Sequence, residues 1–216
     1  MPDGRGKGYG KKAMLRSRKD SFGAVAIILH WTIAVLILGL IGLGFVMRRL
    51  PVDPALQFSL YQWHKSIGLT ALALAVIRLL WWAVDRHPAP VASLGPLERK
   101  ASRTMHIALA AFAVAVPLAG WAVASTSTLN IPTFYFDLVV IPHLPLDKTA
   151  EAEAFWSTAH AAGAYLLLVL AALHAGAAFY HHFRRRDEVL IRMLGTGARR
   201  RPAKKMAAMP PGGKLS

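Results

Sequence analysis

Histidines recur along a strongly apolar stretch between His160 and His182. The stretch reads HAAGAYLLLVLAALHAGAAFYHH and places imidazoles at positions 160, 174, 181 and 182. A polar ring held among Leu, Val and Ala inside a membrane costs free energy unless it binds something, so such histidines are candidates for a functional site. Fourteen residues are close to four helical turns, which puts His160 and His174 on nearly the same face, roughly 21 Å apart along the axis. One helix therefore offers a ligand near each side of a bilayer.

Four apolar segments are long enough to cross a membrane. A spanning helix needs about 18 or more mostly uncharged residues, and the chain of 216 residues is 55% hydrophobic. The segments cover residues 24–46, 61–84, 104–124 and 157–183. The predicted fold class is therefore an all-α integral membrane protein, a bundle of four transmembrane helices. Pro117 lies in the middle of the third segment and predicts a kink there.

Basic residues concentrate on one side of the predicted bundle. Most Lys and Arg precede the first segment, lie between the second and third, or follow the fourth. Loops rich in Lys and Arg stay in the cytoplasm, so both termini are predicted to be cytoplasmic. This distribution accounts for the formal net charge of +15 without a nucleic-acid partner, and we expect none.

Outside the predicted spans the chain divides into two tails and several loops. Residues 1–19 and 195–216 are basic, rich in Gly or Pro, and predicted to be disordered, which leaves residues 20–194 as the membrane domain. The first apolar run is too long for a signal peptide and lacks a cleavage pattern. The apolar loop at 125–156 is interpreted as a re-entrant or interfacial lid on the outer face. His87 and His143, both in loops, have no evident role.

Two more histidines lie at matching depths in other spans. His30 is near the cytoplasmic end of the first span and His174 near that of the fourth, whereas His64 and His160 lie near the outer ends of the second and fourth. The four histidines thus form two pairs, each at one level of the membrane and on different helices. Ligation of a haem by two imidazoles needs this arrangement.

The chemistry of these pairs favours haem over other metal sites. Two imidazoles fill both axial positions of a haem iron, so the haem carries electrons instead of activating a ligand. Without a cysteine in the chain, the haem must be non-covalent. Paired zinc or copper sites are the alternative, but tetrahedral zinc usually takes three or four protein ligands, and neither level offers a carboxylate within the spans. We interpret the pairs as sites for two non-covalent haem b groups, which the bundle encloses.

Short motifs surround these histidines in all four spans. They are HW at His30, WHKSIG at His64 with RLL beyond it, PLAG in the third span, AHxxxAY and LHAxAAxxHHF in the fourth, and DxxLxRML after it. In this order they resemble the bacterial cytochrome b561 family of dihaem inner-membrane proteins, over residues 20–194. The resemblance implies that His30 and His174 ligate the inner haem, and that His64 and His160 ligate the outer one. It also implies superoxide:ubiquinone oxidoreductase activity, with periplasmic superoxide as donor and membrane ubiquinone as acceptor.

Cations near the outer ends of the spans suit an anionic donor. Arg48, Arg49 and Lys65 could form a funnel that raises the local concentration of superoxide, although Arg48 and Arg49 would also suit the headgroup region at a helix end. Arg78 lies fourteen residues beyond His64, deep in the second span. It either pairs with a haem propionate or extends to the cytoplasmic headgroups.

Histidines near the cytoplasmic side suit a quinone site. His106, His181 and His182 are predicted to lie at this level, and an imidazole can donate a proton to a quinone carbonyl and regain one from water. His181 is the first choice because it lies nearly two turns beyond His174 on a similar face. The three could instead be interfacial polar residues beside the basic cluster at 184–186.

Two other functions remain open from the sequence. One is a cytochrome b subunit that passes electrons from a periplasmic dehydrogenase partner to quinone. The other is a haem-free membrane scaffold or metal transporter.

Overall fold

The computed structural model describes residues 15–18, 21–49, 51, 53–85, 88–89 and 94–194. Four long helices dominate it: α2 (Ala24–Arg49), α3 (Pro54–Val84), α4 (Pro96–Thr126) and α5 (Ala150–Tyr180). Each is long and apolar enough to cross a membrane, which confirms the four predicted spans. The predicted disorder of residues 1–14 and 195–216, and the role of His87, lie outside the described residues.

Three of the helices begin earlier than their apolar runs, because capping residues start them in the aqueous or headgroup layer. The Asp53 carboxylate accepts hydrogen bonds from the backbone N–H groups of Ala55 and Leu56, both at 3.1 Å, and Pro54 occupies the first turn. The Thr149 hydroxyl caps α5 by accepting from Ala152 N–H at 3.1 Å. A hydropathy pattern locates only the apolar part of a helix, which lies in lipid. The polar first turns of these three helices were therefore not predicted.

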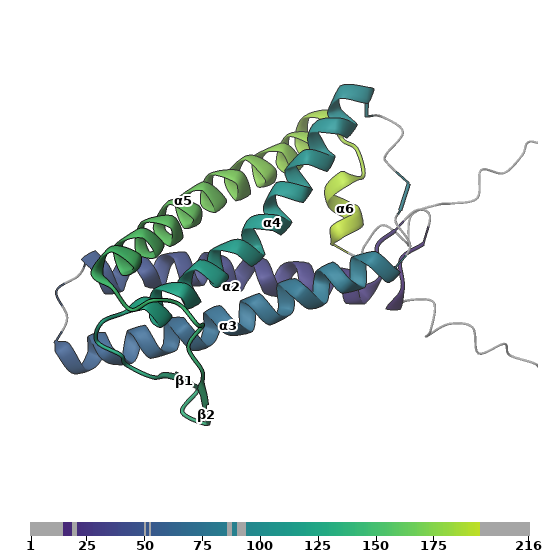
Figure 1. Ribbon diagram of the computed structural model, residues 1–216. Coiled ribbons are helices and arrows are strands. Elements are labelled where there is room, and N and C mark those ends of the chain that lie inside the picture. Colours follow the sequence, from purple (N-terminus) through teal and green to yellow (C-terminus); the bar gives the residue numbers. More distant parts are fainter. Residues whose placement is uncertain are drawn as a thin grey trace, which may run out of the picture.

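The long helices associate in two pairs. In Figure 1, α2 lies along α3 and α4 lies along α5, and α3 and α4 join the pairs. By contrast, α2 and α5 have little direct backbone contact. The side chains of the candidate site project into the space between the two pairs.

Small side chains make up much of the buried interior. The most buried positions on α3 and α4 are Ala71, Ala75, Ala122, Ser66 and Ser125. Large apolar side chains face outward over most of the bundle, as expected for helices surrounded by lipid. Small residues let helix backbones approach closely, which is how membrane helices gain packing energy without a hydrophobic driving force.

The connection between α4 and α5 forms a β-hairpin, whereas the sequence predicted only helices and a lid of undefined structure. Strand β1 (Thr133–Tyr135) pairs antiparallel with β2 (Val139–Ile141). The hairpin lies beside the first half of α3 (Figure 1). Its main anchor is Ser66, whose hydroxyl donates to the Phe134 carbonyl at 2.9 Å and accepts from the Phe136 N–H at 3.0 Å.

Replacing Ser66 by alanine is expected to loosen the hairpin by about 1 kcal/mol, because a partly buried carbonyl and a partly buried N–H lose their partner. Hydrogen–deuterium exchange of residues 133–141 should then accelerate. Ser59→Ala is the control, since the Ser59 hydroxyl donates to the Ala55 carbonyl within the same helix. Unchanged exchange in the Ser66 variant would contradict this account of the anchor.

Short elements close the opposite end of the bundle. Helix α5 continues as the π-helix η1 (His181–Arg185) and is followed by the short helix α6 (Val189–Met193). The Trp31 indole N–H donates to the Met193 carbonyl at 3.0 Å, which ties α6 to α2. The start of α2 and the end of α5 therefore lie at the same end of the bundle.

Residues 15–18, predicted to belong to the N-terminal tail, pack against the end of α3. The Ser17 side chain is buried; its hydroxyl donates to the Asp85 carboxylate at 2.6 Å and accepts from the Gly23 N–H at 3.0 Å. The N-terminal tail that the sequence predicts to extend to residue 19 therefore includes residues that contact the membrane domain.

Candidate functional site

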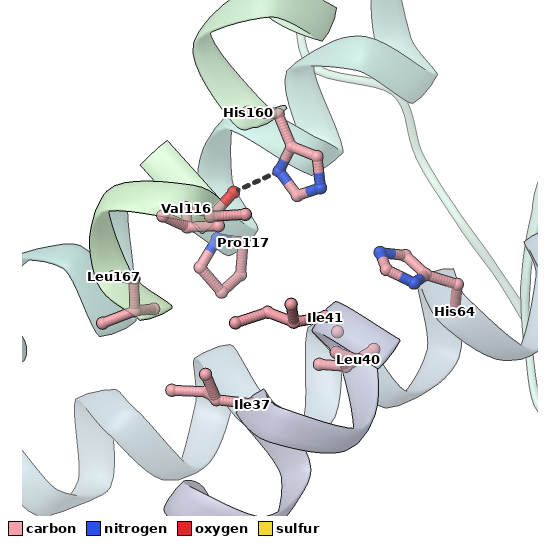
Figure 2. A pocket seen from close by; sticks show the side chains of 10 residues that line it. Ile37, Leu40, Ile41, His64, Val116, Pro117, His160 and Leu167 are labelled. Carbon is pink, nitrogen blue, oxygen red and sulfur yellow. Dashed lines mark hydrogen bonds between the residues drawn. The ribbon is translucent and has the colours of Figure 1, made fainter. Parts of the chain in front are cut away.

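The outer pair of histidines faces a cavity in the middle of the bundle. His64 projects from α3 and His160 from α5, and their ring centres are 6.1 Å apart with the ring planes at 85°. Figure 2 shows the two rings reaching toward each other above an apolar floor. The cavity is lined by Ile37, Leu40, Ile41, His64, Gly68, Val116, Pro117, His160, Ala164 and Leu167. Its only lining side chains with polar atoms are the two imidazoles.

A hydrogen bond fixes the tautomer of His160. Its Nδ1 lies 2.9 Å from the carbonyl oxygen of Val116 (Figure 2). A carbonyl only accepts, so Nδ1 carries the proton and Nε2 keeps its lone pair. Ligating histidines typically donate their second ring N–H to a carbonyl or carboxylate in this way. Val116 thereby prepares His160 to bind a metal through Nε2.

A glycine lies beside each imidazole of this pair, but only the one beside His160 is needed to make room for the ring. A Cβ atom at Gly120 would lie 2.9 Å from Cε1 and 3.1 Å from Nδ1 of His160, closer than real Cβ atoms pack. A Cβ at Gly44 would lie 3.5 Å from Cε1 of His64, in ordinary contact. Within the described residues, the buried Nδ1 of His64 has no hydrogen-bond partner. Gly120 is thus required for the close approach of His160 to α4.

The inner pair lies one level further along the bundle. His30 projects from α2 and His174 from α5, with ring centres 6.3 Å apart and ring planes at 75°. His106 of α4 also contacts His174, at 5.1 Å between ring centres. The four histidines paired by depth in the sequence are therefore neighbours in the structure, and His106 joins the inner level.

The separations within the pairs fit a shared metal. An imidazole nitrogen lies about 2 Å from a bound metal and about 1.2 Å from its own ring centre, so two imidazoles on opposite sides of one ion have centres roughly 6.4 Å apart. Both predicted pairs match this separation closely. The separation of His106 and His174 is too short for it, so His106 is a neighbour of the inner pair, not an axial partner of His174.

Arg78 contacts the inner pair directly. Its guanidinium donates to Nδ1 of His30 at 2.7 Å. Arginine cannot accept, so in this contact the neutral His30 ring carries its proton on Nε2. His30 can offer Nε2 to a metal only when Arg78 releases Nδ1, and the guanidinium is then free to meet an anion. Pairing of Arg78 with a haem propionate stays a prediction.

Donor chemistry argues against the alternative of zinc or copper. Over the described part of the chain, no group of three or more His, Asp or Glu side chains is arranged to hold a metal ion. Each level instead offers two opposed imidazoles among apolar residues, which is the donor set of a bis-histidine haem.

Comparison with known proteins decides the family. The family model described as prokaryotic cytochrome b561 matches residues 21–196. The chain belongs to the prokaryotic cytochrome b561 family. It is also similar to cytochrome b561 homolog 2 of Escherichia coli (strain K12), with 31% identity over 177 residues, which cover 82% of this chain and 92% of that protein.

Membership in the cytochrome b561 family identifies the general activity. The chain is a multi-pass membrane protein that transfers electrons with b-type haem. The resemblance noted from the motifs around the histidines is therefore confirmed, as is the helical bundle.

The remaining histidines predicted for the cytoplasmic side of this cytochrome b561 separate into two groups. His106 belongs to the inner pair, as described above. His181 and His182 lie at the end of α5, where the His181 ring contacts Tyr180 and the His182 ring lies 4.9 Å from that of Phe183. His181 also bonds the Asp187 carboxylate at 2.6 Å. No sequence pattern indicated Asp187, because a spacing of six residues does not bring two side chains together on an α-helix.

A groove beside the inner level was also not predicted from the sequence. It runs between α4 and α5 and is lined by Leu97, Lys100, Ala101, Thr104, Met105, Ala108 and Leu170. Met105 immediately precedes His106, and Leu170 lies one turn before His174. Six of the seven lining residues come from the N-terminal half of α4, where the apolar pattern indicates only the start of a span. The groove therefore lies at about the same depth in the bundle as the inner histidines, none of which lines it.

The predicted outer cations occupy two different environments. Arg48 and Arg49 are exposed in the last turn of α2. Lys65, adjacent to His64, is half-buried and donates to the Pro132 carbonyl at 3.2 Å, so it also holds the loop that leads into β1. Arg48 and Arg49 are thus the more accessible cations at this end.

Proposed function

We propose that this cytochrome b561 carries electrons across the bacterial inner membrane from periplasmic superoxide to ubiquinone, through two haem b groups. His64 and His160 would hold the outer haem, and His30 and His174 the inner one. When bound, haem supplies a one-electron carrier whose iron alternates between two oxidation states. The observation that carries the proposal is the two pairs of opposed imidazoles, one at each level of the bundle.

The residues of this chain tune those sites in different ways. Val116 supports ligation of the outer haem by keeping the His160 proton on Nδ1. With an imidazole from each of two helices, each site would leave a bound haem no open position for oxygen, and the haem would supply electron transfer. The apolar residues around His64 and His160 exclude water from the path. These features favour electron transfer over ligand activation.

The distribution of charge supports the direction of transfer. Segments rich in Lys and Arg adjoin the start of α2 and the end of α5 in the sequence, which supports a cytoplasmic location for that end. The pair His64–His160 then lies toward the periplasm. There, exposed Arg48 and Arg49 attract the superoxide anion and raise its encounter rate.

The cytoplasmic half supplies what quinone reduction requires. Each ubiquinone takes two electrons, released by oxidation of two superoxide anions to two molecules of oxygen, and two protons. The groove lined by Met105 and Leu170 offers a mostly apolar site at the depth of the inner pair. His106, His181 and His182 are the candidate proton donors at this level.

The purified, haem-loaded protein tests the proposal. An enzymatic superoxide source should reduce its haems, and a short-chain ubiquinone should reoxidise them, with quinol formed in step. Haems that superoxide leaves oxidised, but that ubiquinol reduces, would contradict superoxide as donor. That result would favour the cytochrome b subunit of a periplasmic dehydrogenase. A protein purified without haem would contradict both functions.

Replacing Arg48 and Arg49 together by glutamine is expected to slow haem reduction by superoxide several-fold at low salt. The rate should also depend less on ionic strength, because steering by surface cations is screened by salt. Stopped-flow spectroscopy at two salt concentrations measures both effects. Arg103→Gln, on an exposed site of α4 near the opposite end, is the matched control. Identical rates and salt dependence in the double variant would contradict the funnel.

A further inference from the structure

A histidine–carboxylate pair occupies the inner end of α5. Nδ1 of His181 and Oδ2 of Asp187 are 2.6 Å apart, and both side chains are largely buried, at 15% and 7% exposure. A carboxylate so close to one ring nitrogen keeps a proton on Nδ1 and leaves Nε2 as the exchangeable position. In this pair the Asp187 carboxylate therefore orients the His181 imidazole.

The backbone is folded specifically to bring these two residues together. On a regular helix, side chains six residues apart point about 120° away from each other. Here the chain widens into the π-helix η1, and Arg186 takes a left-handed conformation with φ of 54°. The Asp187 N–H then donates to the His181 carbonyl at 3.2 Å. Single π-turns of this kind are frequent at functional sites.

Asp187 is itself held in place. Its Oδ1 accepts from the Val189 N–H at 3.2 Å, while Oδ2 contacts His181. The charged groups that the structure sets near His181 are Asp187, Glu98 of α4, and Arg185, which pairs with Glu98. The two carboxylates come from different parts of the chain: Glu98 from α4, and Asp187 from the link between η1 and α6. The imidazole therefore lies where α4, η1 and the start of α6 meet.

The pair lies at the cytoplasmic end of the groove between α4 and α5. Leu97, which lines the groove, adjoins Glu98, the residue that interacts with both His181 and Arg185. On α5, Leu170 of the groove and His181 are eleven residues apart, about three turns, so they share one face. His181 is therefore on the groove side of α5.

We propose that Asp187 is a positioning residue that holds His181 as the proton donor for quinone bound in this groove. The inference rests on the proposed function. His181 gives the proton on Nε2 to a quinone oxygen, and Nε2 then regains a proton from cytoplasmic water. The two electrons for each quinone come from two superoxide anions by way of the haems. Asp187 keeps the other proton on Nδ1, so the same nitrogen is reloaded each time.

Asp187→Asn tests the assignment in the haem-loaded protein. General acid catalysis contributes roughly 10²–10⁴-fold, so we expect reoxidation of the haems by short-chain ubiquinone to slow at least tenfold. The KM for quinone should stay within about twofold, and haem reduction by superoxide should not change. Nitrogen-15 NMR of the His181 ring should show loss of the single Nδ1–H tautomer, because an Asn amide can also donate to Nδ1.

Further variants test whether His181 and Asp187 act as a unit, and one of them serves as a control. His181→Gln should slow reoxidation as much as Asp187→Asn, and the double variant should be no slower than either, as for residues that act as a unit. Glu188→Gln, which removes the exposed ion pair of the neighbouring carboxylate with Arg192, is the control and should reoxidise normally.

The outcomes separate the inference from the function on which it depends. Wild-type rates in Asp187→Asn or His181→Gln, with wild-type haem content, would overturn the role of this pair alone. Should Asp187→Asn lose haem, His181→Gln decides the matter. A wild-type protein whose haems ubiquinone cannot reoxidise would overturn the proposed acceptor, and the role of the pair with it.

Discussion

Replacing His160 by alanine should remove one haem and leave the other. His160 belongs to the outer pair, and its loss leaves His64 facing the cavity alone. The inner pair, on a different level, keeps both imidazoles. Haem per chain, measured as the pyridine haemochrome, should fall from about two to about one, because a single imidazole holds haem weakly in a bis-histidine site. His174→Ala should have the same effect on the inner haem.

Comparison of variants identifies the pairs. His64→Ala should lose the same spectral component as His160→Ala, and His30→Ala the same one as His174→Ala. His143→Ala is the control, because His143 lies in the loop between β2 and α5, outside both pairs. Full haem content with an unchanged b-type spectrum in His160→Ala would contradict the outer site.

Gly120→Val is expected to disable the outer site without removing a ligand. Even one added carbon would lie 2.9 Å from His160, and the ring cannot retreat without losing its hydrogen bond to the Val116 carbonyl. Overpacking of this kind typically costs about 1–3 kcal/mol. We expect the outer haem to be lost from most molecules, or its reduction potential to shift, while the inner haem is retained. Redox titration with visible spectroscopy measures both outcomes.

Gly39→Val is the matched control for this variant. Gly39 also lies within a long apolar helix, but an added Cβ there meets nothing within 4 Å. It should retain both haems with wild-type potentials. Similar behaviour of the two variants would show that the bundle tolerates the added bulk at Gly120, and that the close approach of His160 to α4 does not matter for the site.

The sequence predicted the parts of this architecture that depend on one-dimensional patterns. Lipid requires long apolar runs, and those runs located α2, α3, α4 and α5. The interval of fourteen residues between His160 and His174 is a property of one helix. Combined with the alternating direction of the spans, it was enough to pair each with a histidine at the same depth. The structure brings both pairs together.

Other features depend on local backbone geometry that apolar patterns do not encode. The contact of Asp187 with His181 needs a π-turn and a left-handed residue, and neither has a residue signature here. The hairpin is anchored because Ser66 and Gln62 offer polar partners to the backbone of the partly buried strand β1, which an apolar loop sequence does not reveal. Gly120 could have been identified from the sequence, because a glycine within a membrane span often marks a position where another helix approaches closely.

The unbroken length of helix α5 mechanically couples the two pairs of histidines. It runs without a break from Ala150 to Tyr180 and holds one imidazole of each pair, whereas α4 carries Pro117 in its middle. Any sliding or tilting of α5 as a rigid helix must displace the rings of His160 and His174 at the same time. Strain introduced near one pair of histidines would therefore be felt at the other, so the two pairs are mechanically coupled through α5.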